Sequence, residues 1–430
     1  MKRAVLVVCD GLRADMVTPE LTPNLMRLAG EARFFANHRG VFPSTTRVTS
    51  ASIATGCLPA RHGLEGNVVA LDEGDGLIAV SAGPPDFRDR LQRVTGRTLM
   101  VSTLAQRLEK HGGSIVYSNV SAGAAQFQDP DGYGYVYHRQ GSYGPGRRPL
   151  SGSDAFDVTH DSAGDAAMTE RFVDEILDAR RPALAVLWQC EPDHSQHACP
   201  LGSPDHRAAI AGADACAARV ATAVEALEAA GDDILLIICS DHGHETVDEV
   251  IPLETLLIDA GLKATASSTD VVVASNGTSA AIYMSDAERY RAGDIVKFLR
   301  GQDWVGEIFA GPDLATVGHR TDTALAIAVT TRNRETANPY GVAGMSHAIA
   351  DPVSGDVPVG CGQHGGLGRH EQQPFMMLCG GGFGRATRVD APSSPIDIAP
   401  TILRHLDLPH DDMDGAPLSR GLTGGARHLQ

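Results

Sequence analysis

The feature that most constrains the fold is a series of short apolar runs that do not alternate with polar residues. Continuous apolar strands are typical of a sheet buried on both faces, whereas the strands of a half-exposed sheet alternate. The runs that predict strands are Ala4–Cys9, Ser114–Ser118, Ala183–Trp188, Ile234–Cys239, Ala324–Val329 and Phe375–Cys379.

Segments with helical periodicity separate these runs. They are Leu21–Ala29, Val48–Ala54, Leu104–Lys110, Ala166–Ala179, Ala208–Ala230, Ala287–Leu299 and Ile396–Leu406. Strands that alternate with helices indicate an α/β fold, with a central, mostly parallel sheet flanked by helices on both faces.

Two segments interrupt the alternation. Residues 119–165 are rich in Gly, Asp, Ser and Tyr, and residues 262–350 carry a second set of apolar runs. A long excursion between core strands usually forms a lid or cap over a site. We therefore predict a core at residues 1–250 and 351–430 with a loop-rich lid at 119–165, and a cap or insert at 251–350 that contributes to the substrate pocket.

The charge balance excludes some partners. Lys and Arg number 36 against 53 Asp and Glu, a formal net charge of −17. Such a chain is repelled by nucleic-acid backbones and anionic membrane surfaces, so we expect neither as a partner. An anionic substrate would then need locally supplied positive charge, and a bound metal is the simplest source.

The apolar runs and cysteines bear on the compartment. No run approaches the ~18 residues of a membrane span, and the run ending at Cys9 is expected to be a core strand and not a signal peptide. The eight cysteines form no C-x-x-C pair. Unpaired buried thiols are typical of a reducing compartment, so we expect a cytoplasmic protein.

Polar residues gather where the apolar strands end, which is where ligands bind in open α/β sheets. Singly, an Asp there is more often a helix cap and a His a satisfied core or surface residue. Together, three carboxylates and three imidazoles make a ligand set suited to Zn²⁺ above all, with Mn²⁺ or Fe²⁺ as alternatives, and six groups suit two metal ions. The candidates are Asp10, Asp193, His197, Asp241, His242 and His364.

A nucleophile candidate lies just ahead of a helical run, in Ser44-Thr45-Thr46. A hydroxyl at a helix start faces free N–H groups and the positive end of the helix dipole, both of which favour anions. Without metals the better interpretation is a simple helix cap. Beside a metal pair, such a hydroxyl becomes a nucleophile towards a phosphoryl group.

The order of these motifs resembles the alkaline phosphatase superfamily, in its type I phosphodiesterase/nucleotide pyrophosphatase branch, which includes phosphonoacetate hydrolases. The resemblance covers about residues 4 to 418. It is carried by Asp10, Pro43-Ser44-x-Thr46 closing in Thr55-Gly56, Asp193-x-x-x-His197, Ser240-Asp241-His242-Gly243, His364-Gly365, Asp397–Leu403 and Met413-Asp414-Gly415.

The resemblance implies two zinc ions and a role for each ligand. Asp193, His197 and His364 would hold one ion. Asp10, Asp241 and His242 would hold the other, with the nucleophile bridging towards it. The branch's nucleophile lies ten residues before the glycine of its Thr-Gly, which here selects Thr46 over Thr45. An asparagine 21 residues after the nucleophile binds a phosphoryl oxygen in the branch, and that position is Asn67. Glu191, His194 and His244 are candidates for supporting these ligands.

Two positions depart from the branch. Arg47 follows the nucleophile where nucleotide pyrophosphatases usually carry an aromatic residue. Phosphonoacetate hydrolases use lysines on the loop after the strand that corresponds to Ser114–Ser118, where this chain has Asn119-Val120-Ser121. The sequence therefore does not favour phosphonoacetate as the substrate.

The resemblance predicts a metal-dependent hydrolase of a small-molecule phosphodiester, nucleotide pyrophosphate or phosphonate, acting through a phosphothreonine. The alternatives are a hydrolase of C–P bonds on the same scaffold and, with less support, a phosphomonoesterase or phosphomutase. A non-enzymatic binding module would be expected to lack a ligand, yet every position is filled.

An aromatic segment between Phe127 and Arg148 admits two interpretations. It contains Phe127, Tyr133, Tyr135, Tyr137 and Tyr143, with Arg139, Arg147 and Arg148 nearby. Aromatics beside arginines could form the leaving-group pocket. Tyrosines at every second position could equally pack one face of a small hairpin.

Overall fold

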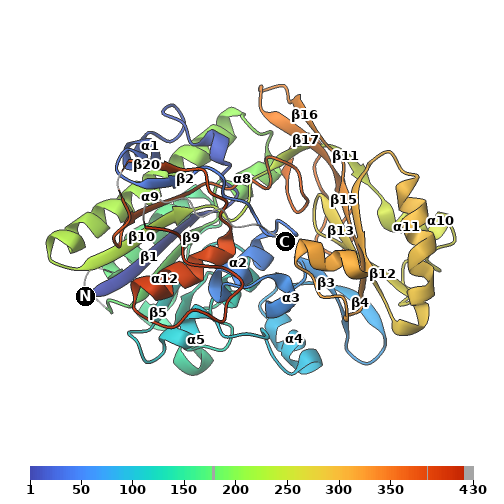
Figure 1. The fold of residues 1–430 in the computed structure, drawn as a ribbon, viewed down its shortest axis with the longest axis horizontal. Helices are drawn as coiled ribbons and strands as arrows, with labels where there is room; N and C mark the ends of the chain where they lie inside the picture. Colours follow the sequence, from blue (N-terminus) through green and yellow to red (C-terminus); the bar gives the residue numbers. More distant parts are fainter. Residues whose placement is uncertain (177–179, 385, 421–430) are drawn as a thin grey trace.

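The computed structural model describes residues 1–176, 180–384 and 386–420. A ten-stranded sheet forms the larger part of the molecule (Figure 1). In spatial order its strands are β20 (Thr387–Val389), β2 (Arg33–Phe35), β19 (Met376–Gly380), β10 (Asp233–Cys239), β1 (Lys2–Cys9), β9 (Leu184–Gln189), β5 (Ser114–Ser118), β6 (Tyr135–Tyr137), β7 (Tyr143–Gly144) and β8 (Arg148–Pro149).

The centre of this sheet is parallel and the outer strands are mixed. Strands β10, β1, β9, β5 and β6 pair with one another in parallel, and so do β2 and β20 at one edge. Strand β19 pairs antiparallel with β10 and with β2, and β7 pairs antiparallel with β6 and β8. The predicted α/β class is confirmed, and the mostly parallel pairing holds for the five central strands.

Helices cover both faces of the sheet because its strands are apolar on both sides. Val5 and Val7 of β1 pack under α1 (Pro23–Ala29), α7 (Ser162–Asp174) and α9 (Pro204–Ala229). Leu6 and Val8 face the opposite layer. That layer consists of α2 (Thr46–Thr55), α5 (Leu104–Leu108), α6 (Ala122–Phe127) and α12 (Ile398–His405).

A smaller lobe lies beside the large sheet (Figure 1). Its antiparallel sheet has the order β12 (Val271–Ser275), β13 (Ser279–Met284), β15 (Leu325–Thr331), β14 (Val305–Ala310), and its outer face packs against α10 (Leu253–Asp259) and α11 (Ala292–Arg300). The inner face packs against the hairpin β3 (Val68–Asp72) and β4 (Leu77–Ser81), together with α2 and α4 (Phe87–Thr95).

A third sheet joins the two parts. Its order is β16 (Asn333–Ala337), β17 (Ala343–Ile349), β11 (Glu245–Ile251), β18 (Gly362–Gln363). The two remaining short helices are α3 (Pro59–His62) and α8 (Asp193–Ala198). Strand β11 continues directly from the loop after β10, and β18 ends just before His364, so this sheet brings segments from both parts of the chain to one place.

The predicted helices shift at their ends. The helix expected at Ala166–Ala179 begins at Ser162, because the Asp161 side chain accepts a hydrogen bond from Gly164 N at 2.8 Å and caps it; its expected last residues, 177–179, lie outside the described part. The helix expected at Ala287–Leu299 begins at Ala292, since residues 286–291 form a 3₁₀ turn.

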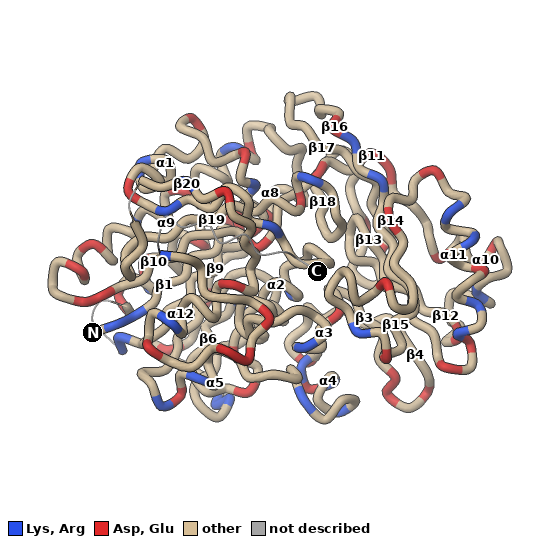
Figure 2. The backbone as a smooth tube through the Cα atoms, viewed as in Figure 1, with Lys and Arg blue, Asp and Glu red and all other residues tan. Residues whose placement is uncertain are grey.

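Charged side chains and cysteines occupy different parts of the fold. Acidic and basic residues are interspersed along the outer loops and helices, while the central strands carry few (Figure 2). All eight cysteines are free thiols, and six of them are buried. Among the described helices, none combines the length and apolar composition that a bilayer crossing needs.

Candidate active site

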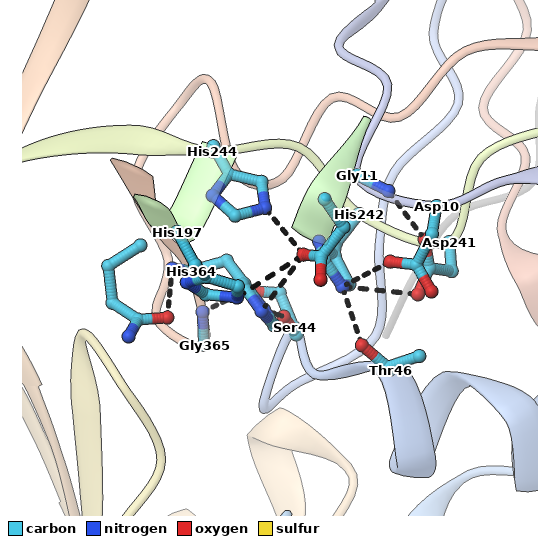
Figure 3. A network of polar contacts seen from close by, with 12 residues as sticks. Asp10, Gly11, Ser44, Thr46, His197, Asp241, His242, His244, His364 and Gly365 are labelled. Atoms are coloured by element: carbon cyan, nitrogen blue, oxygen red, sulfur yellow. Dashed lines mark hydrogen bonds and ion pairs between the residues drawn. The ribbon is translucent and has the colours of Figure 1, made fainter. Parts of the chain in front are cut away.

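Two aspartates and a histidine converge at the carboxyl ends of β1 and β10 (Figure 3). Asp10 Oδ2 accepts a hydrogen bond from Trp188 Nε1 at 2.8 Å, and Asp241 Oδ1 accepts one from Gly11 N at 3.1 Å. The other oxygens, Asp10 Oδ1 and Asp241 Oδ2, are buried without a hydrogen-bond donor in the described part of the chain. They lie 3.5 and 3.1 Å from His242 Nε2.

This first cluster fits a divalent cation. Burial, together with the Asp241 and Asp193 carboxylates, raises the pKa of Asp10 well above its ordinary value. Two buried carboxylates side by side are costly unless a positive charge lies between them. The Nδ1 of His242 lies 3.2 Å from Gly243 O, which accepts a hydrogen bond from a proton carried on Nδ1; in that tautomer the Nε2 lone pair can ligate a cation.

A second cluster surrounds Asp193, the first residue of α8. Its Oδ1 lies 2.7 Å from His244 Nε2, 3.4 Å from His197 Nε2 and 3.6 Å from His364 Nε2. Ligand atoms of Asp193, His242, His244 and His364 lie within 4.8 Å of one another, a set that could hold a metal ion. His197 stands one helical turn from Asp193 but outside that tightest set.

The two clusters adjoin each other. The rings of His242 and His364 are stacked, with centroids 3.6 Å apart and an interplanar angle of 10°. His364 is oriented by its Nδ1, which donates to Ser44 O at 2.6 Å. The structure therefore brings the six predicted ligands, which come from four chain segments, into one site.

Thr46 is the first residue of α2 and faces the first cluster (Figure 3). Its Oγ1 lies 3.0 Å from His242 Nε2, and the residue is 8% exposed. Thr45 precedes the helix in extended conformation, with φ −121° and ψ 145°, and its buried Oγ1 has no partner among the described residues. Of the two candidate hydroxyls, only that of Thr46 reaches the metal cluster.

Two cavities open next to Thr46. The larger, of about 570 Å³, is lined by Asp10, Thr46, Arg47, Asn67, Ser81, Gly83, Pro84, Pro85, Val120, Ser121, Ala122, Arg139, Gln140, His160, Cys190, Asp193, His194, His197, Ser354 and His364. The second, of about 440 Å³, shares Arg47, Asn67, His197, Ser354 and His364 with it. The larger cavity thus joins the predicted nucleophile to ligands of both metal clusters.

Asn67 lies just before β3 and lines both cavities. Its Oδ1 accepts from Arg47 N at 3.2 Å, and its backbone N donates to Asn276 Oδ1 at 2.6 Å. These contacts fix the side chain while no described residue accepts from its Nδ2. That amide group is therefore available to an oxygen of a ligand.

Residues 4–301 match the family model for type I phosphodiesterase/nucleotide pyrophosphatase, which is more than half of the chain. The chain belongs to this family. It is a hydrolase of the phosphodiesterase/nucleotide pyrophosphatase type. A comparison with curated proteins gives no match.

Solved structures of the ectonucleotide pyrophosphatase/phosphodiesterase 5 enzymes (ENPP5) share the fold of this family member. The murine enzyme superposes with a TM-score of 0.68 at 15% identity, covering 96% of this chain and 98% of that one. An inactive threonine-to-alanine variant of it in complex with AMP gives 0.67 at 15% identity, with 97% and 98% covered. The human enzyme gives 0.66 at 15% identity, with 96% and 97% covered.

One buried carboxylate that the sequence analysis missed supports the phosphodiesterase-type site. Glu371 Oε2 accepts from Thr278 Oγ1 at 2.6 Å and from Gly366 N at 2.8 Å, while Oε1 accepts from Gly368 N at 2.8 Å. These bonds hold the glycine-rich loop that follows His364. A glutamate seven residues beyond a ligand gives no sequence signal of such a role.

The supporting candidates separate in the structure. His244 Nε2 makes the shortest of the three histidine contacts to Asp193 Oδ1. Glu191 instead accepts from Ser195 N at 3.0 Å and Ser195 Oγ at 2.9 Å, and so caps α8. The His194 ring lies 4.1 Å from that of His160 on the cavity wall.

Of the two interpretations of the aromatic segment, the leaving-group pocket gains no support from its five aromatics, none of which lines either cavity. Tyr137 is buried and stacks on Tyr117 with centroids 4.4 Å apart. Tyr143 donates from its hydroxyl to Asp129 O at 2.7 Å. The alternative, a small hairpin, is confirmed by the antiparallel β6–β7 pair. Only Arg139 and Gln140 of this segment line the larger cavity.

Proposed function

We propose that this protein hydrolyses a small-molecule phosphodiester, nucleotide pyrophosphate or phosphonate, with Thr46 as the nucleophile. The observation that carries the proposal is the position of the Thr46 hydroxyl. It starts a helix, lies 3.0 Å from His242 Nε2 and borders the cavity beside both metal clusters. The inactive threonine-to-alanine variant of murine ENPP5 supports a threonine in this role.

The donor sets suit two zinc ions, with Mn²⁺ or Fe²⁺ as alternatives. Asp10, Asp241 and His242, with Thr46, would hold one ion. Asp193, His197 and His364 would hold the other, with His244 as an additional imidazole. When bound, zinc supplies Lewis acidity that lowers the pKa of a hydroxyl or a water and offsets phosphoryl charge.

The reaction proceeds through covalent transfer to Thr46. Its Oγ1 gives its proton to solvent and bonds to phosphorus, while the bond from phosphorus to the leaving group breaks and its electron pair goes to the leaving oxygen. The phosphothreonine keeps the other substituent of phosphorus. Water then attacks this phosphorus, the P–O bond to Thr46 breaks, and Oγ1 regains a proton. In this proposal the Asn67 Nδ2 group and the N–H groups at the start of α2, apart from that of Arg47, which donates to Asn67 Oδ1, donate to phosphoryl oxygens.

The zinc-loaded protein tests the proposal directly. We expect turnover of p-nitrophenyl diesters or phosphonate esters above monoesters. Acid quenching during turnover should trap the transferred phosphoryl group, still carrying its second ester or its carbon substituent, on a peptide that contains Thr46. Preferred turnover of monoesters would favour the phosphomonoesterase alternative. Release of phosphate from an alkylphosphonate without an ester bond would favour C–P hydrolysis, and no turnover of any class would refute the proposal.

Replacing Asn67 by alanine is expected to weaken transition-state binding, as measured by kcat/KM, by about 2–4 kcal/mol, the usual cost of losing one such donor. The reason is that Arg47 N holds Asn67 Oδ1, while no described residue accepts from Asn67 Nδ2 at the cavity wall. Steady-state kinetics of Asn67→Ala beside Asn67→Asp would measure it, and an unchanged kcat/KM in the alanine variant would leave Asn67 only a turn residue.

We also propose that the segment 251–350 acts as a cap on the pocket of the metal-binding core. Ser275, Asn276 and Gly277 of this segment line the second cavity. Asn276 Oδ1 accepts from the backbone N of Asn67, which supports a direct link between the cap and the substrate-binding amide. Residues 120–122, 139, 140 and 160 of the predicted lid line the larger cavity.

A further inference from the structure

Two arginines on the larger cavity wall have no carboxylate partner. Arg47 Nε donates to Ser121 Oγ at 3.1 Å, and its Nη1 donates to Asn67 O at 3.2 Å. Arg139 Nη1 donates to Asn119 O at 2.6 Å and to Val120 O at 2.8 Å. All these acceptors are neutral, and neither guanidinium forms an ion pair within the described part of the chain, so neither positive charge is neutralised by direct contact with a carboxylate.

The surrounding chain is built around these charges. A Cβ atom at Gly83 would lie 2.6 Å from Arg47 Nη2, so glycine there leaves room for the guanidinium. Burial lowers the pKa of Arg47 to about 10, while Asp351, Asp193 and Asp10 act on it only through space. Arg47 therefore remains cationic at neutral pH.

The rest of the wall mixes polar side chains with small apolar ones such as Pro84, Pro85 and Val120, and it lacks large aromatic rings. Beside Arg139 lie Gln140 and the His160–His194 pair, and no Phe, Tyr or Trp lines either cavity in the described part of the chain. Stacking of a nucleobase normally uses such rings. The carboxylates on the larger cavity's wall, Asp10 and Asp193, belong to the metal clusters. The remaining surface is thus suited to an anion and not to a base.

We propose that the substrate carries, besides the reacting phosphorus, a second anionic group such as a carboxylate or another phosphoryl group, which binds between Arg47 and Arg139. The proposal rests on the proposed function and narrows its substrate class to small dianionic molecules without a nucleobase. Arginine forks bind carboxylate and phosphoryl oxygens by paired, charge-assisted hydrogen bonds. A carboxylate and a second phosphoryl group would both bind in this way.

The test compares ligands that differ only in this charge. The Thr46→Ala variant, which lacks the proposed nucleophile, is loaded with zinc and titrated calorimetrically with 3-phosphonopropanoate and with the analogue in which a carboxamide replaces the carboxylate. Homologues one carbon shorter and one carbon longer cover the unknown distance between the two anionic groups. In a second series a phosphate ester replaces the carboxylate. We expect the anionic member of at least one pair to bind about tenfold tighter or more. The series that shows the larger ratio identifies the carboxylate or the phosphoryl group as the preferred anion.

Variants locate the effect. Arg47→Gln and Arg139→Gln are each introduced alone into the Thr46→Ala protein. Each should reduce the affinity ratio, which is the affinity for the carboxylate ligand divided by that for its carboxamide, to below about threefold and leave binding of the carboxamide unchanged. Arg171→Gln is the matched control, because Arg171 is likewise held by a carbonyl, Ala155 O at 2.7 Å, and lies over the Tyr137 ring away from the cavities. It should preserve the ratio.

The proposal is overturned if charged and neutral ligands bind equally, if neither binds, or if the ratio survives both cavity variants. Failure of the proposed function looks different. Full turnover by Thr46→Ala would remove the threonine mechanism while the affinity ratio, which needs no turnover, would still report the anion site. Conversely, a Thr46-dependent activity without an affinity ratio would leave the proposed function intact and refute only the second anion.

Discussion

Replacing Thr46 by alanine is expected to lower kcat on the order of 10⁴-fold or more, since removal of a catalytic nucleophile has effects of this size. The metal ligands should remain in place, because Asp10 and Asp241 are positioned by Trp188 and Gly11 and not by Thr46. Steady-state kinetics combined with elemental analysis of the purified variant would measure both effects.

Two neighbouring variants serve as controls. Thr46→Ser keeps a hydroxyl at the helix start and should retain partial activity. Thr45→Ala removes a hydroxyl that is equally buried but has no partner in the described structure, and its turnover should stay near that of the parent. An inactive Thr45→Ala beside an active Thr46→Ala would show that the nucleophile is one residue earlier.

Removing the metal is expected to abolish turnover and to destabilise the fold. We expect about two zinc equivalents in the protein as isolated, because two donor clusters converge. A tight ligand at about a thousand times its Kd adds about 4 kcal/mol to stability. Chelation should therefore lower Tm by several degrees, and zinc should restore it. Full activity in chelator, with no transition metal found by elemental analysis, would refute the metal mechanism.

The increase in Tm that zinc produces should depend on pH. Without an ion, burial and the neighbouring Asp241 and Asp193 raise the pKa of Asp10. The folded state then keeps a proton that the unfolded chain loses above about pH 4, so metal-free stability falls as pH rises towards the raised pKa. Ligand deprotonation also favours zinc at higher pH. The gain in Tm on adding zinc should be larger at about pH 8 than at about pH 5.

The pKa of Asp193 is shifted in the opposite direction, but this does not change the direction in which the zinc-induced gain in Tm varies with pH. Burial opposes ionisation of its carboxyl, but His197 and His244 outweigh burial and hold the pKa of Asp193 well below its ordinary value. Its contribution to stability is therefore present above about pH 4 and is lost only below it. Differential scanning calorimetry at matched ionic strength would separate the two windows.

Much of the central sheet could be predicted because its strands are uniformly apolar. Ser114–Ser118 has the same bounds in the sequence analysis and in the structure, and the run at Ala4–Cys9 is extended only by Lys2 and Arg3. The apolar pattern could not predict strand direction. Strand β19 is as apolar as the parallel strands β10 and β1, yet it pairs antiparallel with β10. The two-residue strands β7 and β8 are too short to leave a period.

The site could be predicted where its residues form motifs at strand ends, and not where tertiary contacts define a role. The order of the motifs, and the spacing that the family resemblance implies, led to Thr46 and to the candidate metal ligands. No motif marks Glu371, which accepts from Gly366 N and Gly368 N of its own loop and from two distant hydroxyls, Thr278 Oγ1 and Ser44 Oγ, that folding brings to it. The alternating tyrosines misled for the same reason, since period two cannot distinguish a strand facing a core from one facing a ligand.

The wide separation of the ligands along the chain has a consequence for biosynthesis. Asp10 is made first, while His364, whose ring stacks on that of His242, follows only after more than 350 further residues. A nascent chain that has already paired β1 with β9 would hold Asp10 and Asp193 near each other without the imidazole that completes the second cluster. Because domains generally fold as synthesis proceeds from the N-terminus, a completed pair of ion sites arises only once the segment that contains His364 has left the ribosome.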